Sequence, residues 1–311
     1  MNNKIAVLMA TYNGAKFIKK QLQSILKQSY KNFDLIIRDD GSSDNTVAII
    51  KRICNDPKEN KNNIQVEILI NSSDAHGQVK NFSELYKFAI SKRKYEYIMF
   101  SDQDDLWLED KVLTSLNEIH KFGNTPALLY TNYYVYNTAT NEKQIAYKRY
   151  LPYSFEKMFV QNWTMGCTFI MNKTMIDIVP NIPSGVENHD YWLALNAALT
   201  NNLHYLAEPT MVHILHNSNV TAKANSDTAR ERVKRVYKEV LLKKGRSIKY
   251  IAWNSSVNAL DLMYSDNSHI KKLKEVMHAS RLKSILLANK YKYKGLNKRT
   301  TILFYLYLLL K

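Results

Sequence analysis

Cysteine is scarce in this sequence, and the two cysteines match no metal or disulfide framework. Cys54 and Cys167 stand far apart in a chain of 311 residues, and their spacing fits neither pattern. We therefore expect two small, buried, weakly polar side chains in a protein of a reducing compartment. The class of small secreted domains held together by disulfides is excluded.

Long apolar runs and targeting signals are also missing. No stretch contains the roughly 18 apolar residues that a membrane-spanning helix requires. Residues 1–4 and the short apolar run after them lack the apolar core and the cleavage site of a signal peptide. Residues 4–10 are better explained as a first strand, so we expect a chain without a signal peptide or a spanning helix.

Acidic residues are scarce in the last third of the chain. The formal net charge is +16, and residues 222–311 hold 21 of the 44 lysines and arginines but only 6 of the 28 acidic residues. Residues 1–221 are close to neutral. The contrast predicts a domain of residues 1–221 followed by a basic helical region of residues 222–311. No nucleic-acid-binding motif accompanies the charge, so we expect no nucleic acid partner.

Short apolar runs alternate with amphipathic segments through the first part of the chain. The predicted strands of this part are residues 5–10, 33–37, 64–70, 97–101 and 127–136. Strands that alternate with helices are typical of an α/β fold, with a mostly parallel, twisted sheet flanked by helices. Further along we expect a hairpin-like connection at residues 137–154 and two short strands, 204–207 and 211–215.

Three carboxylates follow the fourth apolar run. From residue 97 the chain reads Tyr-Ile-Met-Phe-Ser-Asp-Gln-Asp-Asp-Leu-Trp, which places Asp102, Asp104 and Asp105 directly after a strand of the buried type. Ligands of such sheets bind beyond the carboxyl ends of the strands. Closely spaced acids at this place favour a hard divalent cation. The competing interpretation is that Asp104 or Asp105 begins the next helix.

Together with other short motifs, this stretch resembles the family 2 glycosyltransferases, which have the Rossmann-like GT-A fold. The resemblance covers about residues 4–221. Its motifs are Ala10-Thr11-Tyr12-Asn13-Gly14, Asp39-Asp40-Gly41-Ser42-Ser43-Asp44-Asn45-Thr46, Asp102-Gln103-Asp104, Gly166-Cys167-Thr168 and His189-Asp190. The form Ser-Asp-Gln-Asp-Asp-Leu-Trp is most similar to rhamnosyltransferase-like enzymes of bacterial surface polysaccharide synthesis.

The resemblance implies a sugar transfer that depends on Mg²⁺ or Mn²⁺, because the leaving diphosphate develops charge. It assigns Asp104 to the metal, and Asp102 to the donor ribose or to the metal through water. His216 corresponds to a family histidine near the diphosphate, so it is a candidate for metal or phosphate, with a structural role as the alternative. The family's arginine two residues earlier is Ile214 here, which puts a direct arginine–phosphate contact in doubt. For Asp105, a helix cap and a supporting role remain open.

The resemblance also implies contacts to the nucleotide-sugar donor. The residues concerned are Thr11, Tyr12, Asn13, Asp39, Asp40, Lys80, Asn81 and Asp102. The first three would line the base and the ribose. Asp39 or Asp40 would accept a hydrogen bond from the base, and the alternative for this segment is a plain turn and helix cap. For Lys80 the alternative is a solvated position on a helix surface.

Acceptor activation requires a general base. By resemblance this base is Asp190, and capping of the following helix is its alternative role. His189 would orient the acceptor or stack on it, and Glu187 is an alternative base. Trp163 and Trp192 could present aromatic faces to sugar rings, or they could belong to the core.

The basic region is predicted to be helical over residues 229–290, and it is followed by a near-apolar stretch at residues 301–310. Basic amphipathic helices with an apolar end are typical of interfacial anchors on anionic membranes. Packing as a helical subdomain and a surface for homo-oligomer formation are the alternatives. We expect a cytoplasmic protein located peripherally at the inner face of the cell membrane.

The resemblance therefore predicts an inverting enzyme that adds a sugar, for example rhamnose from dTDP-rhamnose, to a lipid-linked surface polysaccharide such as a capsule. The sequence lacks the Gln-x-x-Arg-Trp motif of processive synthases, so we expect non-processive transfer. A UDP-hexose transferase, a nucleotidyltransferase and a non-catalytic nucleotide- or glycan-binding membrane adaptor are the alternatives. The nucleotidyltransferase is disfavoured because Thr11–Gly14 is not a glycine-rich basic loop.

Overall fold

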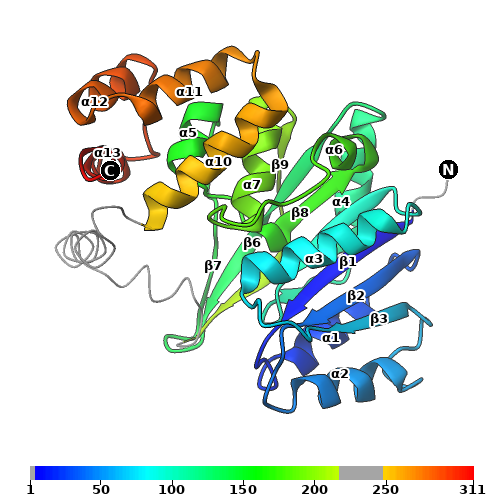
Figure 1. Cartoon of the computed structure of the whole chain (residues 1–311). Helices are drawn as coiled ribbons and strands as arrows, with labels where there is room; N and C mark the ends of the chain where they lie inside the picture. Colours follow the sequence, from blue (N-terminus) through cyan, green and yellow to red (C-terminus); the bar gives the residue numbers. More distant parts are fainter. Residues whose placement is uncertain (1–3, 217–247) are drawn as a thin grey trace. The chain divides into compact units, whose positions relative to one another are not determined.

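The computed structural model describes residues 4–216 and 248–311 (Figure 1). The chain forms two compact units, which we call the sheet unit and the helical unit. The sheet unit consists of Met1–Leu151, Thr164–Ile182 and Asn202–His216, and the helical unit of Pro152–Trp163, Pro183–Asn201 and Asn217–Lys311. The predicted domain boundary between residues 221 and 222 lies outside the described residues and stays a prediction.

The sheet unit is built on one nine-stranded sheet, which confirms the predicted α/β fold. Its strands are β1 (Ile5–Thr11), β2 (Phe33–Asp39), β3 (Gln65–Ile70), β4 (Tyr97–Ser101), β5 (Leu106–Trp107), β6 (Leu128–Asn137), β7 (Glu142–Ile145), β8 (Phe169–Asn172) and β9 (Leu203–Leu215). Their order is β3-β2-β1-β4-β8-β6-β9-β5, with β7 on β6. The pairs β3–β2, β2–β1, β1–β4 and β6–β9 are parallel, whereas β8 is antiparallel to both β4 and β6.

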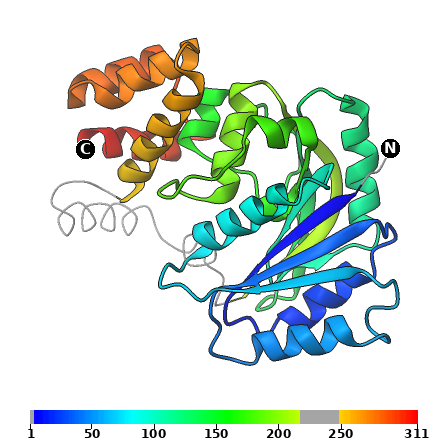
Figure 2. The same cartoon turned by 45° about the vertical axis from the view of Figure 1, so that its right-hand side comes forward.

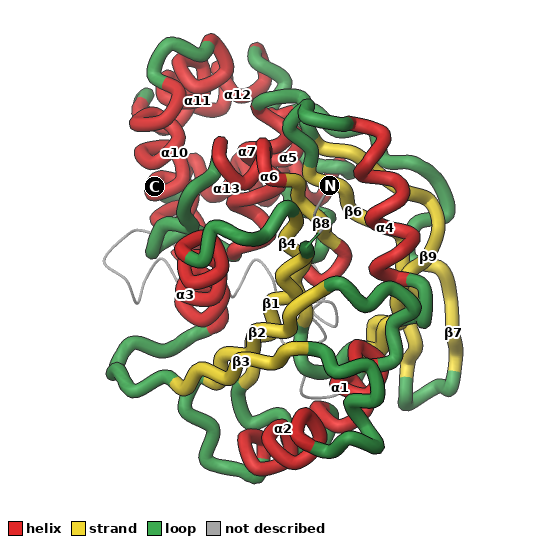
Figure 3. The backbone as a smooth tube through the Cα atoms, turned by 90° about the vertical axis from the view of Figure 1, so that its right-hand side faces the viewer, coloured by secondary structure: helices red, strands yellow, loops and turns green. Residues whose placement is uncertain are grey.

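Helices pack on both faces of this sheet. They are α1 (Ile18–Leu26), α2 (Thr46–Asn55), α3 (Gln78–Ser91), α4 (Lys111–Ile119) and α6 (Lys173–Ile178), with short 3₁₀ turns at His120–Phe122 and Gly166–Thr168. Helix α3 lies on one face of β1–β3, and α1 and α2 lie on the other (Figures 2 and 3). In α1 the apolar residues recur at helical spacing, and Ile18, Leu22 and Ile25 are fully buried.

Three local predictions meet different outcomes. The hairpin-like connection is confirmed, because β7 pairs with the end of β6. The two short strands predicted at 204–207 and 211–215 are one strand, β9, whose register against β6 shifts near Pro209. Proline cannot donate to a strand ladder, so an irregularity accommodates it. A helix beginning at Asp104 or Asp105 is wrong, because β5 comes first and α4 begins at Lys111 after Asp110.

The helical unit contains α5 (Phe155–Val160), α7 (His189–Leu199), α10 (Ile248–Tyr264), α11 (Ser268–His278), α12 (Arg281–Lys290) and α13 (Lys298–Leu309). Its aromatic core centres on Trp253, whose ring lies 5.8 Å from Phe159, 5.1 Å from Phe304 and 5.4 Å from Tyr307. The predicted helical segment 229–290 is confirmed for residues 248–290, apart from short breaks, and residues 229–247 lie outside the described residues. Within the described ranges, no helix is both long enough and apolar enough to cross a membrane.

Candidate active site

The carboxyl ends of β1, β2 and β4 meet at one edge of the sheet. Thr11 is paired with Asp39, and Met9 is paired with Ser101, in parallel ladders. The segments that follow these strands therefore begin side by side, as the sequence predicted for acids at strand ends. This edge is the candidate active site.

Asp39 holds the turn after β2 through four hydrogen bonds. Its Oδ1 accepts from the backbone N–H groups of Gly41 (3.1 Å) and Ser42 (2.7 Å), and its Oδ2 accepts from the hydroxyls of Thr11 (2.9 Å) and Ser42 (2.6 Å). A carboxylate has about four acceptor positions. The fully buried Asp39 is thus saturated within the chain.

Asp40 is bound to the next loop and retains acceptor capacity. It accepts from the side chain of Asn71 at 2.9 Å and from the backbone N–H of Gly77 at 2.7 Å. The guanidinium of Arg38 lies 3.4 Å away and also donates to Asn81 Oδ1 at 2.8 Å. Asp40 is therefore better suited than Asp39 to accept a further hydrogen bond from a nucleobase.

The other predicted donor-binding residues differ in how available they are. Tyr12 is exposed (54%) after β1. Asn13 has the left-handed φ of 46° and accepts from the backbone N–H of Ser43 at 2.9 Å, so it joins the two loops. Asn81 is buried and bonds to the strand ends, whereas Lys80 is half exposed and forms an ion pair with Glu84 on α3. A pair of this kind is common on helix surfaces.

Gln103, the middle residue of the Asp-x-Asp motif, joins the loops after β4 and β1. Its Oε1 accepts from the backbone N–H of Tyr12 at 2.9 Å, and its Nε2 donates to the carbonyl of Tyr12 at 3.0 Å. The same side chain passes over Gly14, where an added Cβ would lie 2.2 Å from Oε1. The segment that carries Asp102 and Asp104 is therefore attached to the predicted donor loop.

The two adjacent acids Asp104 and Asp105 each pair with a histidine from the end of β9. His216 Nε2 donates to Asp104 Oδ2 at 3.1 Å, and His213 Nδ1 donates to Asp105 Oδ1 at 2.7 Å. The antiparallel pairing of β5 with β9, through Leu106 and Val212, brings these residues together. The predicted metal candidates Asp104 and His216 thus lie at one place.

Burial and charge set the protonation of this cluster. Burial, followed by the neighbouring carboxylate of Asp105, raises the pKa of Asp104, while His216 and His213 oppose the rise. For His213, burial lowers the pKa, but the hydrogen bond and the charge of Asp105 outweigh it and the net pKa is raised. The raised pKa favours a protonated His213.

The carboxylates suit a hard cation, and the cysteine beside them does not. Ligand atoms of Asp102, Asp105 and Cys167 lie within 4.8 Å of one another. The second oxygen of Asp105 is buried, and the Cys167 thiol lies within reach of this carboxylate. Burial raises the pKa of the Cys167 thiol well above its usual value, and a neutral thiol is a poor ligand for Mg²⁺ or Mn²⁺. The acids, with His216, are the groups that could hold the ion.

A buried lysine lies near Asp105. Lys111 is almost fully buried, donates to Thr210 Oγ1 at 3.1 Å and lies 4.9 Å from the ring centre of Trp107. Burial lowers its pKa to about 8, although the charge of Asp105 favours the protonated form. Lys111 therefore contributes a positive charge to a region crowded with carboxylates.

The predicted acceptor-side residues belong to the helical unit. Helix α7 begins at His189 after the N-cap residue Asn188, so Asp190 lies in its first turn and accepts from the backbone N–H of Tyr191 at 2.6 Å. His189 is buried, and burial lowers its pKa to about 3, which keeps the ring neutral. Trp163 is also buried. Trp192, the other candidate sugar platform, is fully buried, which fits a core role.

Sequence reasoning missed four residues of the site. They are Arg38, Gln103, Lys111 and His213. His213 carried a usable signal, because it lies three residues before His216 in the predicted strand end. Arg38, Gln103 and Lys111 carried no such signal in the sequence, since arginine, glutamine and lysine side chains are usually solvated.

Comparison with known proteins defines the class. The structure resembles the crystal structure of S. aureus TarS 1–349 in complex with UDP-GlcNAc, with a TM-score of 0.55 at 15% identity over 93% of this chain and 80% of that chain. This likeness establishes the GT-A fold. The family model for glycosyl transferase family 2 matches residues 6–176. The chain belongs to this family and is a glycosyltransferase.

Two relatives are involved in sugar transfer. The dTDP-rhamnosyl transferase RfbG of Shigella flexneri is 31% identical over 219 residues, which cover 68% of this chain and 72% of the relative. The glucosyltransferase WfgD of Escherichia coli, named for transfer from UDP-Glc to α-D-GlcNAc-diphosphoundecaprenol, is 26% identical over 200 residues, which cover 64% and 71%. The predicted resemblance to rhamnosyltransferase-like enzymes of family 2 is confirmed.

Proposed function

We propose that this glycosyltransferase moves a sugar from a nucleotide-diphosphate donor to a lipid-linked glycan, with inversion and one sugar at a time. The cluster of three acids at the end of β4, paired with His213 and His216 and attached to the loop after β1, carries this proposal. Rhamnose from dTDP-rhamnose is the favoured donor, because RfbG is named for it. A UDP-hexose is the second candidate, supported by WfgD.

Donor binding falls on the edge formed by β1, β2 and β4. In this proposal Tyr12 and the backbone of Asn13 line the base and ribose, and Asp40 accepts a hydrogen bond from the base. Asp39 and Asn81 position these loops, because their polar groups are bonded within the chain. Lys80, which is paired with Glu84 on the helix surface, is assigned only a peripheral role.

Asp104 and His216 are the proposed metal ligands, and Asp102 contacts the ribose or a metal-bound water. A bound Mg²⁺ or Mn²⁺ would neutralise the charge that develops on the leaving diphosphate. Metal ligation by His216 through Nε2 requires a change in its hydrogen bond to Asp104. The stacking of its ring on Phe17, at a centroid distance of 4.0 Å, holds the imidazole in place.

Asp190 is the proposed general base that takes the proton of the acceptor hydroxyl. It lies in the first turn of α7, where it accepts from the backbone N–H of Tyr191 and where the helix dipole favours a negative charge. The buried, neutral His189 has too low a pKa to be an effective base near neutral pH. His189 instead supports the start of α7. Trp163 is 9% exposed, so in this proposal it contacts the acceptor through the edge of its ring.

We further propose a peripheral location at an anionic membrane surface, with α12 as the contact. In α13 the residues Phe304 and Leu308 are buried, so the final apolar stretch is used for packing within the helical unit. Leu282 and Leu286 on α12 are 72% and 70% exposed and lie one turn apart. Residues 276–311 contain eight lysines and arginines and no acidic residue, which suits anionic headgroups.

Donor turnover tests the proposal directly. Purified protein with Mn²⁺ should release dTDP slowly from dTDP-rhamnose, and faster with a suitable acceptor. Release of UDP from UDP-glucose instead would favour the second candidate. A well-folded sample that turns over neither donor, with lipid-linked acceptor present, would support the non-catalytic adaptor.

A further inference from the structure

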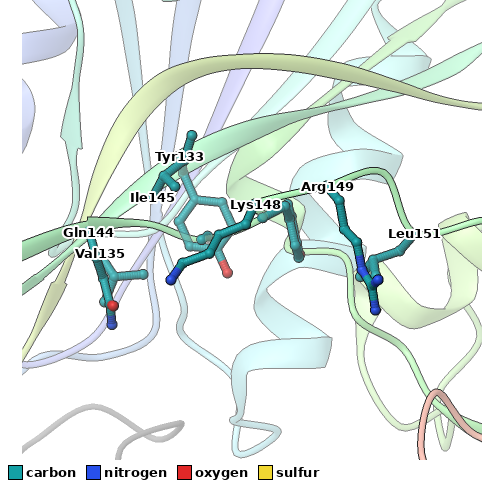
Figure 4. A pocket seen from close by; sticks show the side chains of 9 residues that line it. Tyr133, Val135, Gln144, Ile145, Lys148, Arg149 and Leu151 are labelled. Atoms are coloured by element: carbon teal, nitrogen blue, oxygen red, sulfur yellow. The ribbon is translucent and has the colours of Figure 1, made fainter.

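A pocket of about 420 Å³ lies along the β6–β7 hairpin of the sheet unit (Figure 4). Its lining includes the rings of Tyr133 and Tyr147, the amide of Gln144 and the cationic side chains of Lys148 and Arg149. Figure 4 shows the side chains of Lys148 and Arg149 extending from the segment that follows β7. Aromatic rings, an amide and cations at one place are the groups that bind a charged sugar.

The aromatic wall of this pocket belongs to a cluster of tyrosines. The ring of Tyr147 lies 5.6 Å from Tyr133 and 6.0 Å from Tyr205, and both pairs are edge-to-face. Tyr150 lies 5.9 Å from Tyr205 and is 52% exposed. Such packing fixes the rings of Tyr133 and Tyr147, which line the pocket and are partly exposed, so they can contact a ligand without further loss of side-chain freedom. The apolar C–H face of a sugar ring can pack on a surface of this kind.

The pocket shares a wall with the acidic cluster of the active site. The ring of Tyr133 meets that of His213 edge-to-face at 6.3 Å, and His213 donates to Asp105. Val135, also in the lining, is the register partner of His213 in the β6–β9 ladder. A molecule in the pocket would therefore lie beside the place where the donor's sugar is expected.

The charge of the pocket has one sign. None of the described residues that line it is acidic, and Lys148 and Arg149 are both exposed. A neutral sugar would gain little from two cations, whereas a phosphate or carboxylate would gain charge-assisted hydrogen bonds. Arginine in particular binds both groups in a bidentate manner.

We propose that this pocket is an acceptor subsite that binds a sugar carrying an anionic group, a phosphate or a carboxylate. The tyrosine cluster packs on the sugar ring, and Arg149 and Lys148 bind the anion. The inference rests on the proposed function, because only a glycosyl transfer requires an acceptor beside the donor site. The anion has two possible sources, the diphosphate of a lipid carrier or the carboxylate of an acidic sugar.

Binding of small sugars to the full chain tests this assignment. The probes are N-acetylglucosamine 1-phosphate, methyl β-glucuronide and the neutral methyl β-glucoside, titrated by NMR or calorimetry. The wild-type protein should bind one of the anionic probes at least about tenfold more tightly than the neutral one. Preference for the phosphate points to a lipid diphosphate, and preference for the glucuronide points to an acidic sugar.

Matched variants locate the binding. The exchange K148A/R149A should remove the preference for the anion, while K58A/K61A, which removes two exposed charges elsewhere in the sheet unit, should leave it intact. Equal binding of charged and neutral probes, no binding of any probe, or an unchanged preference in K148A/R149A would overturn the assignment.

A second measurement on the same samples separates this inference from the proposed function. The melting temperature with dTDP and Mn²⁺ is recorded on each sample. K148A/R149A should keep the nucleotide-induced rise, because the donor edge is unchanged. Loss of that rise together with the anion preference would place the two cations at the donor diphosphate and overturn the acceptor assignment. No rise in the wild type would instead count against the donor site.

Discussion

The side chain of Gln103 pairs with the backbone of Tyr12 as a neighbouring strand would, donating to its carbonyl and accepting from its N–H. This contact joins the Asp-x-Asp segment to the loop expected to hold the nucleoside. Any shift of one loop is thereby passed to the other. The β1–β4 ladder and this amide together set the spacing between the Asp-x-Asp segment and the loop after β1.

The close approach of Gln103 to Gly14 gives a test of that contact. Gly14→Ala should destabilise the protein by about 1–2 kcal/mol, because the new methyl group would displace the Gln103 side chain from its two hydrogen bonds with Tyr12. The φ of Gly14 is not in the left-handed region, so the penalty comes from this displacement and not from backbone strain. In the Q103A background, the exchange of Gly14 for alanine should cost much less free energy of unfolding than in the wild type. Urea unfolding of the wild type, G14A, Q103A and G14A/Q103A measures this difference. Additive losses would contradict the contact.

Removal of the proposed metal-binding carboxylate of Asp104 tests metal binding separately from folding. Asp104→Asn should weaken Mn²⁺ binding in the presence of nucleotide by about 10–100-fold, since a charged ligand is lost. The measurement is calorimetric titration of Mn²⁺ into the nucleotide-saturated protein. Asp177→Asn, which removes an exposed acid of α6, is the matched control and should bind as the wild type does. Equal affinities in the two variants would remove Asp104 from the metal site.

The general base can be tested without a change in donor binding. Asp190→Asn should lower kcat by about 10²–10⁴-fold, because the amide cannot take a proton. The nucleotide-induced rise in melting temperature should stay as in the wild type. Glu187→Gln, which removes the nearby acid paired with Lys249, should retain most activity. The reverse result would identify Glu187 as the base.

The buried His189 should make stability depend on pH in acid. Its folded pKa of about 3 lies below the unfolded value of 6.5, so the unfolded state binds the extra proton between these values. Stability is therefore complete above pH 6.5 and falls as the pH is lowered, by roughly 2 kcal/mol at pH 5. His189→Asn should show a smaller loss between pH 7 and pH 5 in urea unfolding. An equal slope in both proteins would contradict a neutral, buried ring.

Vesicle binding tests the contact assigned to α12. The full chain should sediment with vesicles that contain phosphatidylglycerol and not with pure phosphatidylcholine, and salt should weaken the binding. L282S/L286S should bind at least about tenfold more weakly, since two exposed leucines lose their burial in the interface. A concentration-dependent dimer that the same exchanges abolish would show instead that α12 is an interface between copies of the chain.

The parts of the fold that sequence predicted best are those fixed by local pattern. Apolar runs of strand length predicted β1, β2 and β4 to within about two residues. Their alternation with helices predicted a parallel sheet, which brings the residues after these strands to one edge. The short β5 was missed, since two residues carry no period, and with it the pairing of Asp105 with His213. The continuity of β9 was missed because Pro209 ordinarily interrupts a strand.

The side chains of the site were harder to predict than its strands. Asp39 and Asp40 look alike in sequence, and only their hydrogen bonds separate a saturated acid from one with capacity to spare. Lys111 stands at the start of a helix, where a lysine is usually solvated, so its burial near Asp105 has no local signal. Gln103 acts through a loop 91 residues away in the chain. Such relationships depend on tertiary packing.

The most direct test of the central claim is the melting temperature of the wild-type protein with dTDP, UDP or GDP, each with and without Mn²⁺. A nucleotide that binds only the folded state at about 100 times its Kd adds about 2.7 kcal/mol of stability, a rise of roughly 4 °C for a chain of 311 residues. We predict such a rise with dTDP, and only when Mn²⁺ is present. A cooperative transition that no nucleotide shifts, with or without metal, would contradict a nucleotide-sugar site at the end of β4.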